Sequence, residues 1–307
     1  MRKPLVAACL ALAAAGAGAA PAAAADDTGK PVVDLRPVTE SVGRIATDLG
    51  RAVPQAPTPT PGAQAVGFAG SVSLSNCSGS LIRMPDSRDD DPALVMSNGH
   101  CLESGFPAPG EVVVDQASSR SFGLLDANGT RVATLRAARL AYATMTDTDV
   151  AVYRLTQTYA QIKAASGIAP LTLNDTRPAA GTAISVVSGY WKRIYRCSVD
   201  GFAHRLKEGD WTWKDSVRYT AACDTVGGTS GSPVVDEATG KVVAVNNTGN
   251  ESGERCTVNN PCEVDESGTV TVREGINYAQ QTYPIPACFG IGNKLDLGAD
   301  GCVLPKP

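Results

Sequence analysis

The sequence lacks several features that would point to common classes of protein. It has only two histidines and no Cys-x-x-Cys pair, which argues against a zinc site. Charged residues make up 19% of the chain and the net charge is −4. The sequence therefore shows neither the cluster of basic residues typical of nucleic-acid binding nor an acidic tail. No stretch of convincing length repeats with a helical period, which argues against an α-rich fold.

Glycine, proline and short β-rich runs make up much of what is present. The 307 residues include 31 glycines and 20 prolines but few phenylalanines, a composition that fits many short strands and turns. Apolar runs such as residues 74–84, 93–96 and 182–188 alternate with turn signals such as residues 126–129. Strands at this spacing predict two packed antiparallel barrels.

The first part of the chain differs in composition from the rest. Arg2 and Lys3 precede an alanine-rich apolar stretch and small residues suited to cleavage, so residues 1–25 are predicted to be a secretory signal peptide. A membrane helix is the alternative, but no second apolar segment follows. Residues 26–64, with a proline-rich stretch at 53–61, are predicted to be a pro-segment or a Pro-rich linker. We therefore expect a secreted, extracellular protein.

The cysteines predict disulfides. Signal cleavage would remove Cys9 and leave eight of the nine cysteines, an even number in an exported protein. Eight cysteines can pair in roughly a hundred ways, so spacing alone fixes none of them. Cys256–Cys262 and Cys288–Cys302 are close enough in sequence to form local bridges.

Three separated segments carry groups suited to acyl transfer. The glycine-rich turn at 223–233 presents Ser230, His100 follows an apolar run, and Asp149 begins a β-rich run. A hydroxyl is a weak nucleophile unless an imidazole accepts its proton and a carboxylate orients that imidazole. Glycines in the turn leave backbone amides uncovered, so those of Gly228 and Ser230 can donate to one oxygen.

Each of these side chains has a competitor nearby or elsewhere in the chain. His204 is the second histidine, but no partner motif surrounds it. Asp147 lies two residues before the β-rich run, and Ser232 follows Ser230 in the same turn. The non-catalytic interpretations are an ordinary glycine-serine turn and a hydrogen-bonded loop histidine.

The ordered set of motifs resembles the chymotrypsin family of secreted serine proteases, and within it the bacterial branch that includes glutamyl endopeptidases. The resemblance runs from about residue 66 to 280 in the family's own order. Any one motif is weak, but the ordered set is specific. It consists of CSGSLI at 77–82, NGHC at 98–101, DVAV at 149–152, SGY at 188–190, GTSGSP at 228–233 and GINY at 275–278.

The resemblance implies a fold and a set of roles. The fold is all-β, with two antiparallel six-stranded β-barrels at 65–175 and 176–285, an active site between them, and a disulfide-stapled tail at 286–307. His100, Asp149 and Ser230 would be the general base, its carboxylate partner and the nucleophile, and the amides of Gly228 and Ser230 the oxyanion hole.

The resemblance also bears on the cysteines and on the residue before the nucleophile. It implies the disulfide Cys77–Cys101, which would brace the histidine loop, and Cys197–Cys223 then follows by elimination. Many relatives carry an aspartate before the nucleophile, which pairs with a freed N-terminal ammonium. Thr229 stands there in this chain and has no charge. We expect the active loop not to depend on such an ion pair.

Substrate preference rests on the residues expected to line the specificity pocket. Asp224 stands where trypsin-like relatives place an acid at the base of that pocket, and a buried carboxylate there favours Arg or Lys. Thr225 and Gly249 would line the pocket. The same Asp-Thr pair occurs in the glutamyl branch, where a histidine on a later strand selects glutamate. Here Asn246 holds that place and no histidine follows Ser230. We expect cleavage after Arg or Lys, with glutamate as the alternative.

Together these features predict a secreted, monomeric, trypsin-like serine endopeptidase that acts on protein or peptide substrates without a metal or cofactor. No nucleic-acid or membrane partner is expected. A non-catalytic protease-like binding module is one alternative, against which the complete set of three side chains argues. An esterase with the same chemistry is another, but the Gly-x-Ser-x-Gly elbow of the α/β-hydrolases is absent.

Overall fold

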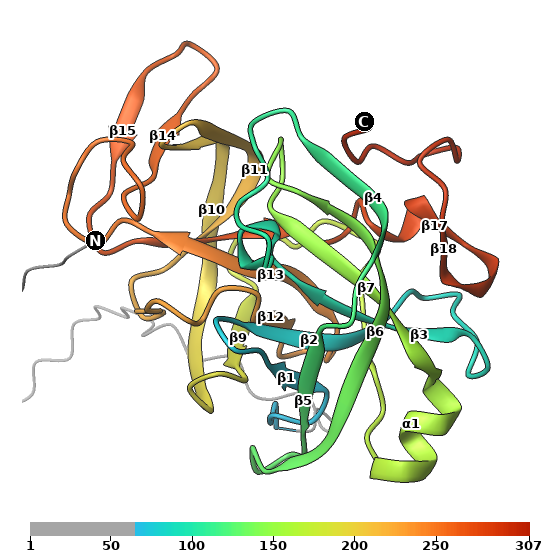
Figure 1. Cartoon of the computed structure of the whole chain (residues 1–307). Coiled ribbons are helices and arrows are strands. Elements are labelled where there is room, and N and C mark those ends of the chain that lie inside the picture. The colour runs from blue at the N-terminus through green and yellow to red at the C-terminus, as the bar shows by residue number, and fades with distance from the viewer. Residues whose placement is uncertain (1–64) are drawn as a thin grey trace, which may run out of the picture. The chain divides into compact units, whose positions relative to one another are not determined.

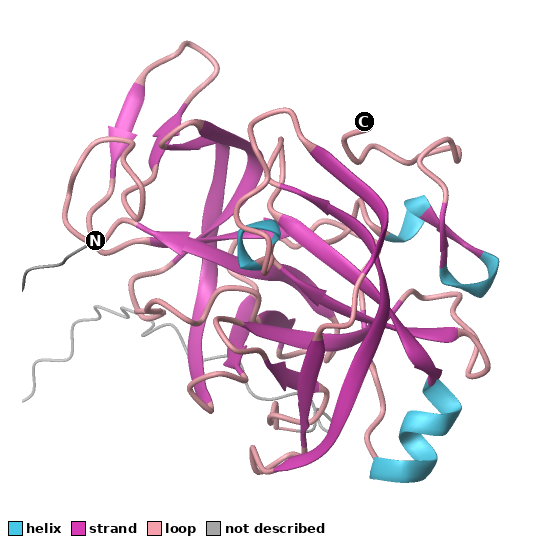
Figure 2. Cartoon of the chain, in the orientation of Figure 1, coloured by secondary structure: helices cyan, strands magenta, loops and turns pink. Residues whose placement is uncertain are grey.

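The computed structural model describes residues 65–307, which consist mainly of β-strands (Figure 1; Figure 2). The predicted signal peptide at 1–25 and the pro-segment or linker at 26–64 lie outside the described residues. No helix within residues 65–307 is long and apolar enough to cross a membrane.

The first barrel is a closed ring of antiparallel strands in the order β1-β5-β6-β7-β3-β2, in which β2 pairs back with β1. Outside the ring, β4 pairs with β6 and β8 runs parallel to β2. The strands are β1 (Ser71–Ser73), β2 (Ser78–Arg83), β3 (Pro92–Ser97), β4 (Val112–Ala117), β5 (Ser121–Leu125), β6 (Arg131–Thr144), β7 (Val150–Thr158) and β8 (Leu171–Thr172).

The second barrel closes in the same way, in the order β11-β16-β13-β12-β9-β10 with β10 paired back to β11. β14 and β15 extend the sheet from β10 as a hairpin. The strands are β9 (Ala183–Ser188), β10 (Arg193–Glu208), β11 (Trp211–Tyr219), β12 (Pro233–Asp236), β13 (Val242–Gly249), β14 (Cys262–Val264), β15 (Val270–Val272) and β16 (Asn277–Gln281). The two rings confirm the predicted fold class.

Several strands are buried on both faces, which explains their uninterrupted apolar sequences. Because side chains alternate across a strand, Leu81 and Val95 enter the core of the first barrel. Their neighbours Ile82, Leu94 and Met96 face the other way. These neighbours belong to a second apolar cluster that joins the two barrels and the C-terminal tail, and that also contains Val187, Val235, Val242, Ile285, Phe289 and Leu304.

One α-helix departs from the expectation that the chain has no helix of note. α1 (Tyr159–Ser166) follows β7, and the Thr158 hydroxyl and the Gln161 side chain form a reciprocal capping box at its start. Gly167 ends it with a left-handed φ of 74°. The helix is only eight residues long and buries just two side chains, so its apolar period was too short to read from the sequence.

The tail is built from short elements that pack on the first barrel and the shared cluster. The Tyr142 hydroxyl of β6 donates to the carbonyl of Pro305 at 3.0 Å. Outside the tail, a one-turn 3-10 helix, η1 (Gly99–Cys101), follows β3 in the first barrel. The tail elements are η2 (Pro286–Cys288), β17 (Phe289–Gly290), η3 (Ile291–Asn293) and β18 (Lys294–Leu295).

Four disulfides link the described cysteines in the pairs expected from the sequence. Two of them lie beside the predicted site. One joins the loop residue directly before β2 to η1, and the other joins β10 to the loop before Ser230. The others close the loop before β14 and staple the tail. The pairs are Cys77–Cys101, Cys197–Cys223, Cys256–Cys262 and Cys288–Cys302.

Truncation of the shared cluster tests how far it holds the fold together. Leu94 is fully buried there, so Leu94→Ala should lower the free energy of unfolding by about 2–5 kcal/mol. Val303 in the tail is 71% exposed, and Val303→Ala should change the free energy of unfolding by less than about 0.5 kcal/mol. Denaturant titration of both variants measures the difference, and equal effects would contradict this description of the core.

Candidate active site

The predicted base and its carboxylate partner are joined directly. The Asp149 side chain is fully buried at the start of β7, and its Oδ2 lies 2.6 Å from Nδ1 of His100. Because a carboxylate can only accept, Nδ1 carries the proton and Nε2 is left free. The backbone amide of His100 donates to Oδ1 at 3.1 Å, and the Asn98 side chain donates to the carbonyl of Asp149 at 2.8 Å. The imidazole is therefore fixed in one orientation.

The electrostatic environment favours the charged form of this histidine. Burial alone would lower the pKa of His100, because it removes water from the imidazolium. The charge and hydrogen bond of Asp149, with a smaller contribution from the charge of Glu208, outweigh burial and raise the pKa above its ordinary value. The imidazole is thus a stronger base than it would be in water.

The turn that carries His100 is held tightly by its surroundings. A Cβ at Gly99 would lie 2.2 Å from the carbonyl oxygen of Thr144, so no other residue fits there without a shift. The buried Arg120 guanidinium donates to the carbonyl of Cys101 at 2.6 Å and to the hydroxyl of Tyr153 at 2.9 Å. Cys101 is also tied by its disulfide.

The loop that carries Ser230 runs between the two barrels. The backbone carbonyl of Ser230 accepts a hydrogen bond from the amide of Ser78 in the first barrel at 2.8 Å. The amide of Gly231 donates to the carbonyl of Asn246 in the second at 2.9 Å. Gly231 has a φ of 81°, and a Cβ there would lie 2.2 Å from the carbonyl oxygen of Ser78. The position of Ser230 is therefore set by both barrels at once.

Thr229 is held by neutral groups. It is buried, and its hydroxyl donates to the carbonyl of Val226 at 2.5 Å. The same oxygen accepts from Nδ2 of Asn246 at 3.1 Å, and Oδ1 of Asn246 accepts from the Tyr219 hydroxyl at 3.2 Å. An uncharged chain of hydrogen bonds thus holds Thr229, in agreement with the expectation that this loop does not depend on an ion pair.

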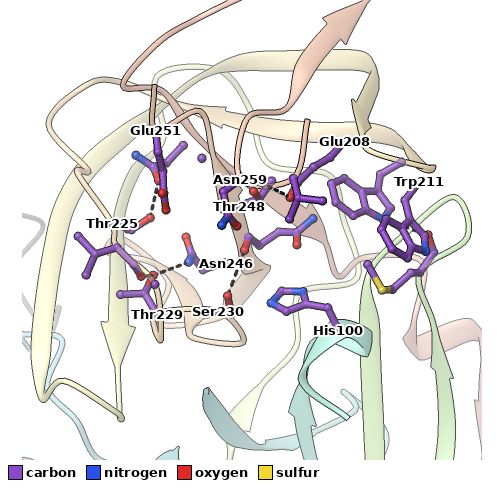
Figure 3. Close-up of a pocket in the computed structure, with 18 of the residues that line it drawn as sticks. His100, Glu208, Trp211, Thr225, Thr229, Ser230, Asn246, Thr248, Glu251 and Asn259 are labelled. Atoms are coloured by element: carbon purple, nitrogen blue, oxygen red, sulfur yellow. Dashed lines mark hydrogen bonds between the residues drawn. The ribbon is translucent and has the colours of Figure 1, made fainter. Parts of the chain in front are cut away.

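His100 and Ser230 line one cavity, which is open to solvent (Figure 3). Ser230 Oγ donates to the carbonyl of Asn247 at 3.3 Å. Among the hydrogen bonds of residues 65–307, none joins Ser230 to His100, and neither the Gly228 nor the Ser230 amide is a donor. Catalytic hydrogen bonds are often long or misaligned without substrate. Neither amide is therefore occupied by a hydrogen-bond partner in residues 65–307.

The expected specificity residues separate into two groups. Thr225, Asn246 and Gly249 line the cavity, and the Thr225 hydroxyl donates to Oδ1 of Asn277 at 2.7 Å. Asp224, in contrast, is exposed, so the expectation of a buried carboxylate at the base of the pocket is wrong. Asn277 also donates to the carbonyl preceding Asp224 at 3.1 Å, so it holds both neighbours of that residue. Asp224 lines a neighbouring pocket instead.

The competing residues have other partners and do not line the cavity. His204 is half-exposed and lies 3.9 Å from a carboxylate oxygen of Glu266. Asp147 pairs with Nζ of Lys214 at 2.5 Å. The buried Ser232 hydroxyl donates to the carbonyl of Thr229 at 2.6 Å.

Several lining residues were missed by sequence reasoning. The hairpin between β10 and β11 brings Glu208 and Trp211 to the His100 side of the cavity (Figure 3). Phe106 makes edge contacts with both the His100 and Trp211 rings, with centroid separations of 5.7 Å in each case. Glu251 lies on the Thr225 side. No motif marks these positions, because a long hairpin and loops from both barrels bring them together.

Solved structures of low similarity include three bacterial proteases. The active form of the Rv3671c protease from Mycobacterium tuberculosis is 14% identical, with a TM-score of 0.45 over 83% of this chain and 97% of that one. The protease domain of MamO from Magnetospirillum magneticum is 13% identical, with a TM-score of 0.44 over 70% and 93%. The Nocardiopsis protease is 11% identical, with a TM-score of 0.41 over 72% and 94%. Scores this low carry no functional conclusion.

Sequence comparison gives a firmer result. No curated protein matches the chain. The family model of the trypsin-like peptidase domain matches residues 77–245, more than half of the chain and the stretch that contains His100, Asp149 and Ser230. The chain therefore belongs to the trypsin-like peptidase family.

Proposed function

We propose that this protein is a secreted serine endopeptidase that cleaves peptide bonds through Ser230, His100 and Asp149. The observation that carries the proposal is the buried Asp149–His100 pair, which shares a cavity with a serine fixed by both barrels. We further propose that the enzyme acts as a monomer on proteins or peptides.

The proposed chemistry follows from the positions of these groups. Ser230 Oγ turns from the carbonyl of Asn247, attacks the scissile carbonyl carbon and passes its proton to Nε2 of His100. Asp149 stabilises the imidazolium. The oxygen that becomes negative accepts from the amides of Gly228 and Ser230. His100 then protonates the leaving amine as the peptide bond breaks, and water releases the acyl group from Ser230 by the reverse steps.

We further propose a preference for Arg or Lys before the scissile bond. No lysine or arginine lines the cavity within the described chain, whereas Glu208 and Glu251 do. Glu251 and Asp224 also line the neighbouring pocket, next to Thr225. A substrate carboxylate would meet these like charges, which disfavours the alternative of a glutamate-preferring enzyme related to the bacterial glutamyl endopeptidases.

The nucleophile is tested by covalent labelling. A serine-reactive fluorophosphonate should label the wild-type protein at one site per chain, and Ser230→Ala should abolish both labelling and peptide hydrolysis. Ser232→Ala is the matched control in the same turn and should still be labelled, because its hydroxyl bonds the backbone of Thr229 and does not line the cavity. A wild-type protein that folds but takes no label would be the non-catalytic binding module.

The base is tested by the pH dependence of kcat/KM. Only neutral His100 accepts the proton, so activity should fall as the pH drops through the His100 pKa. Because Asp149 raises that pKa, the midpoint should lie above the ordinary value of 6.5. Asp149→Asn should move the midpoint down and lower kcat by about 10⁴-fold. A wild-type midpoint below 6.5 would contradict the assigned electrostatics.

Residue preference is tested with paired chromogenic peptides that end in Arg or Glu. The wild-type protein should prefer Arg. Glu251 and Asp224 are exposed, so removing each charge through Glu251→Gln or Asp224→Ser should reduce the Arg-to-Glu ratio of kcat/KM by at most about fivefold. A wild-type protein that prefers Glu would overturn the proposed specificity but leave the proposed chemistry in place.

A further inference from the structure

Glu208 is a buried carboxylate that the proposed chemistry does not use. It ends β10, is only 7% exposed, and lines the cavity that contains His100 and Ser230. Its Oε1 accepts from the amide of Asn259 at 2.9 Å. Its Oε2 is buried and makes no hydrogen bond of ordinary geometry in residues 65–307, although the Thr248 hydroxyl is close enough to favour its charged form, and no lysine or arginine of that range is among the charges acting on it.

This arrangement is unfavourable as long as the cavity holds no counter-charge. Burial raises the pKa of Glu208, and the Thr248 hydroxyl, the Asn259 amide and the charge of His100 offset only part of that effect. An ionised carboxylate deprived of water is stabilised most by a cation that reaches it directly. Asp149 already partners His100, and no lysine or arginine of the described residues lines the cavity, so a cationic substrate group would supply the charge that the protein itself does not.

The side chains around Glu208 fit a long basic residue. Trp211 and Phe106 stack edge to face at the same side of the cavity, and the Trp211 indole is fixed by a hydrogen bond from Nε1 to the carbonyl of Pro107 at 2.9 Å. Lysine and arginine carry an apolar stem that packs on aromatic rings and a cation that binds a carboxylate. A glutamate side chain would bring a second negative charge, and a short apolar one would leave Oε2 without a partner.

The place of Glu208 relative to Ser230 fixes which substrate residue it would meet. In Figure 3, Thr225 and Glu251 lie on one side of Ser230, and Glu208 and Trp211 lie on the side of His100. Successive side chains of an extended peptide point in opposite directions. If the residue before the scissile bond faces Thr225, the residue preceding it faces His100 and Glu208.

We propose that Glu208, Trp211 and Phe106 form a subsite that selects lysine or arginine as the second residue before the scissile bond. The inference rests on the proposed peptidase function and deepens it. Together with a basic residue in the pocket beside Thr225, it makes segments with two consecutive basic residues the preferred substrates.

Fluorogenic peptides test the subsite. All carry Arg before the scissile bond, and the preceding residue is Lys, norleucine or Glu. The wild-type protein should show a Lys-to-norleucine ratio of kcat/KM of about 10 to 100, because a charge-assisted hydrogen bond is gained. Glu208→Gln should bring the ratio close to one, since the amide can still accept from Asn259 but has no charge. The exposed Glu266→Gln on the β14–β15 hairpin is the matched control and should leave the ratio unchanged.

Two outcomes would overturn the subsite: a wild-type ratio near one, or a ratio that Glu208→Gln does not change. Stoichiometric fluorophosphonate labelling of Glu208→Gln shows that this variant is folded, so loss of structure cannot produce the result. Moving the lysine to the third or fourth position before the bond should remove the Glu208-dependent gain, and a gain that appears only there would also overturn the assignment.

A binding measurement separates failure of the subsite from failure of the proposed function. Fluorescence anisotropy with Ser230→Ala protein compares the labelled Lys and norleucine peptides without cleavage. If the wild-type protein neither cleaves nor takes the label, the peptidase proposal fails. Tighter binding of the Lys peptide that is lost in Ser230→Ala/Glu208→Gln would still support the subsite, whereas equal binding of both peptides would overturn it.

Discussion

The structure depends on one narrow crossing, where the loop of Ser230 passes between the barrels. Ser78 of the first barrel donates to the carbonyl of Ser230, and Gly231 donates to the carbonyl of Asn246 in the second. A side chain at position 231 would collide with the Ser78 carbonyl, so the two barrels approach as closely as the backbone allows. The histidine and aspartate come from the first barrel and the serine from the second, and this contact sets the distance between them.

Charged groups hold the site residues of the first barrel in place, and neutral hydrogen bonds hold those of the second. The first barrel uses charge: a buried aspartate orients the imidazole, and a buried arginine holds the turn beside it. The second barrel uses uncharged hydrogen bonds, from Tyr219 through Asn246 to Thr229. A neutral chain of this kind does not change its strength with pH between about 5 and 8, because none of its groups titrates there. The pH response of the site is therefore expected to come from His100 and Glu208.

The sequence predicts best what is encoded locally or by motif. The apolar runs at 74–84 and 93–96 predicted strands where β2 and β3 lie, and the glycines around Ser230 predicted a tight turn. It fails where a position is defined by distant segments. Asp224 was expected to be buried but is exposed, in a segment where Asn277 from β16 contacts the Cys223 carbonyl and the Thr225 hydroxyl on either side of it. Glu208 enters the cavity on a long hairpin whose bend and length no local pattern reveals.

Two of the disulfides link the assembly of the site to the redox state of the compartment that holds the protein. Cys77–Cys101 ties down the turn with the imidazole, and Cys197–Cys223 anchors the segment that leads to the hydroxyl. Each half of the site thus has its own covalent tether. In a reducing compartment both disulfides would be open, and both halves of the site would lack their covalent constraint. If the chain is the exported peptidase proposed above, oxidation would complete both halves only outside the cytoplasm, and its activity would then depend on the redox state of its surroundings.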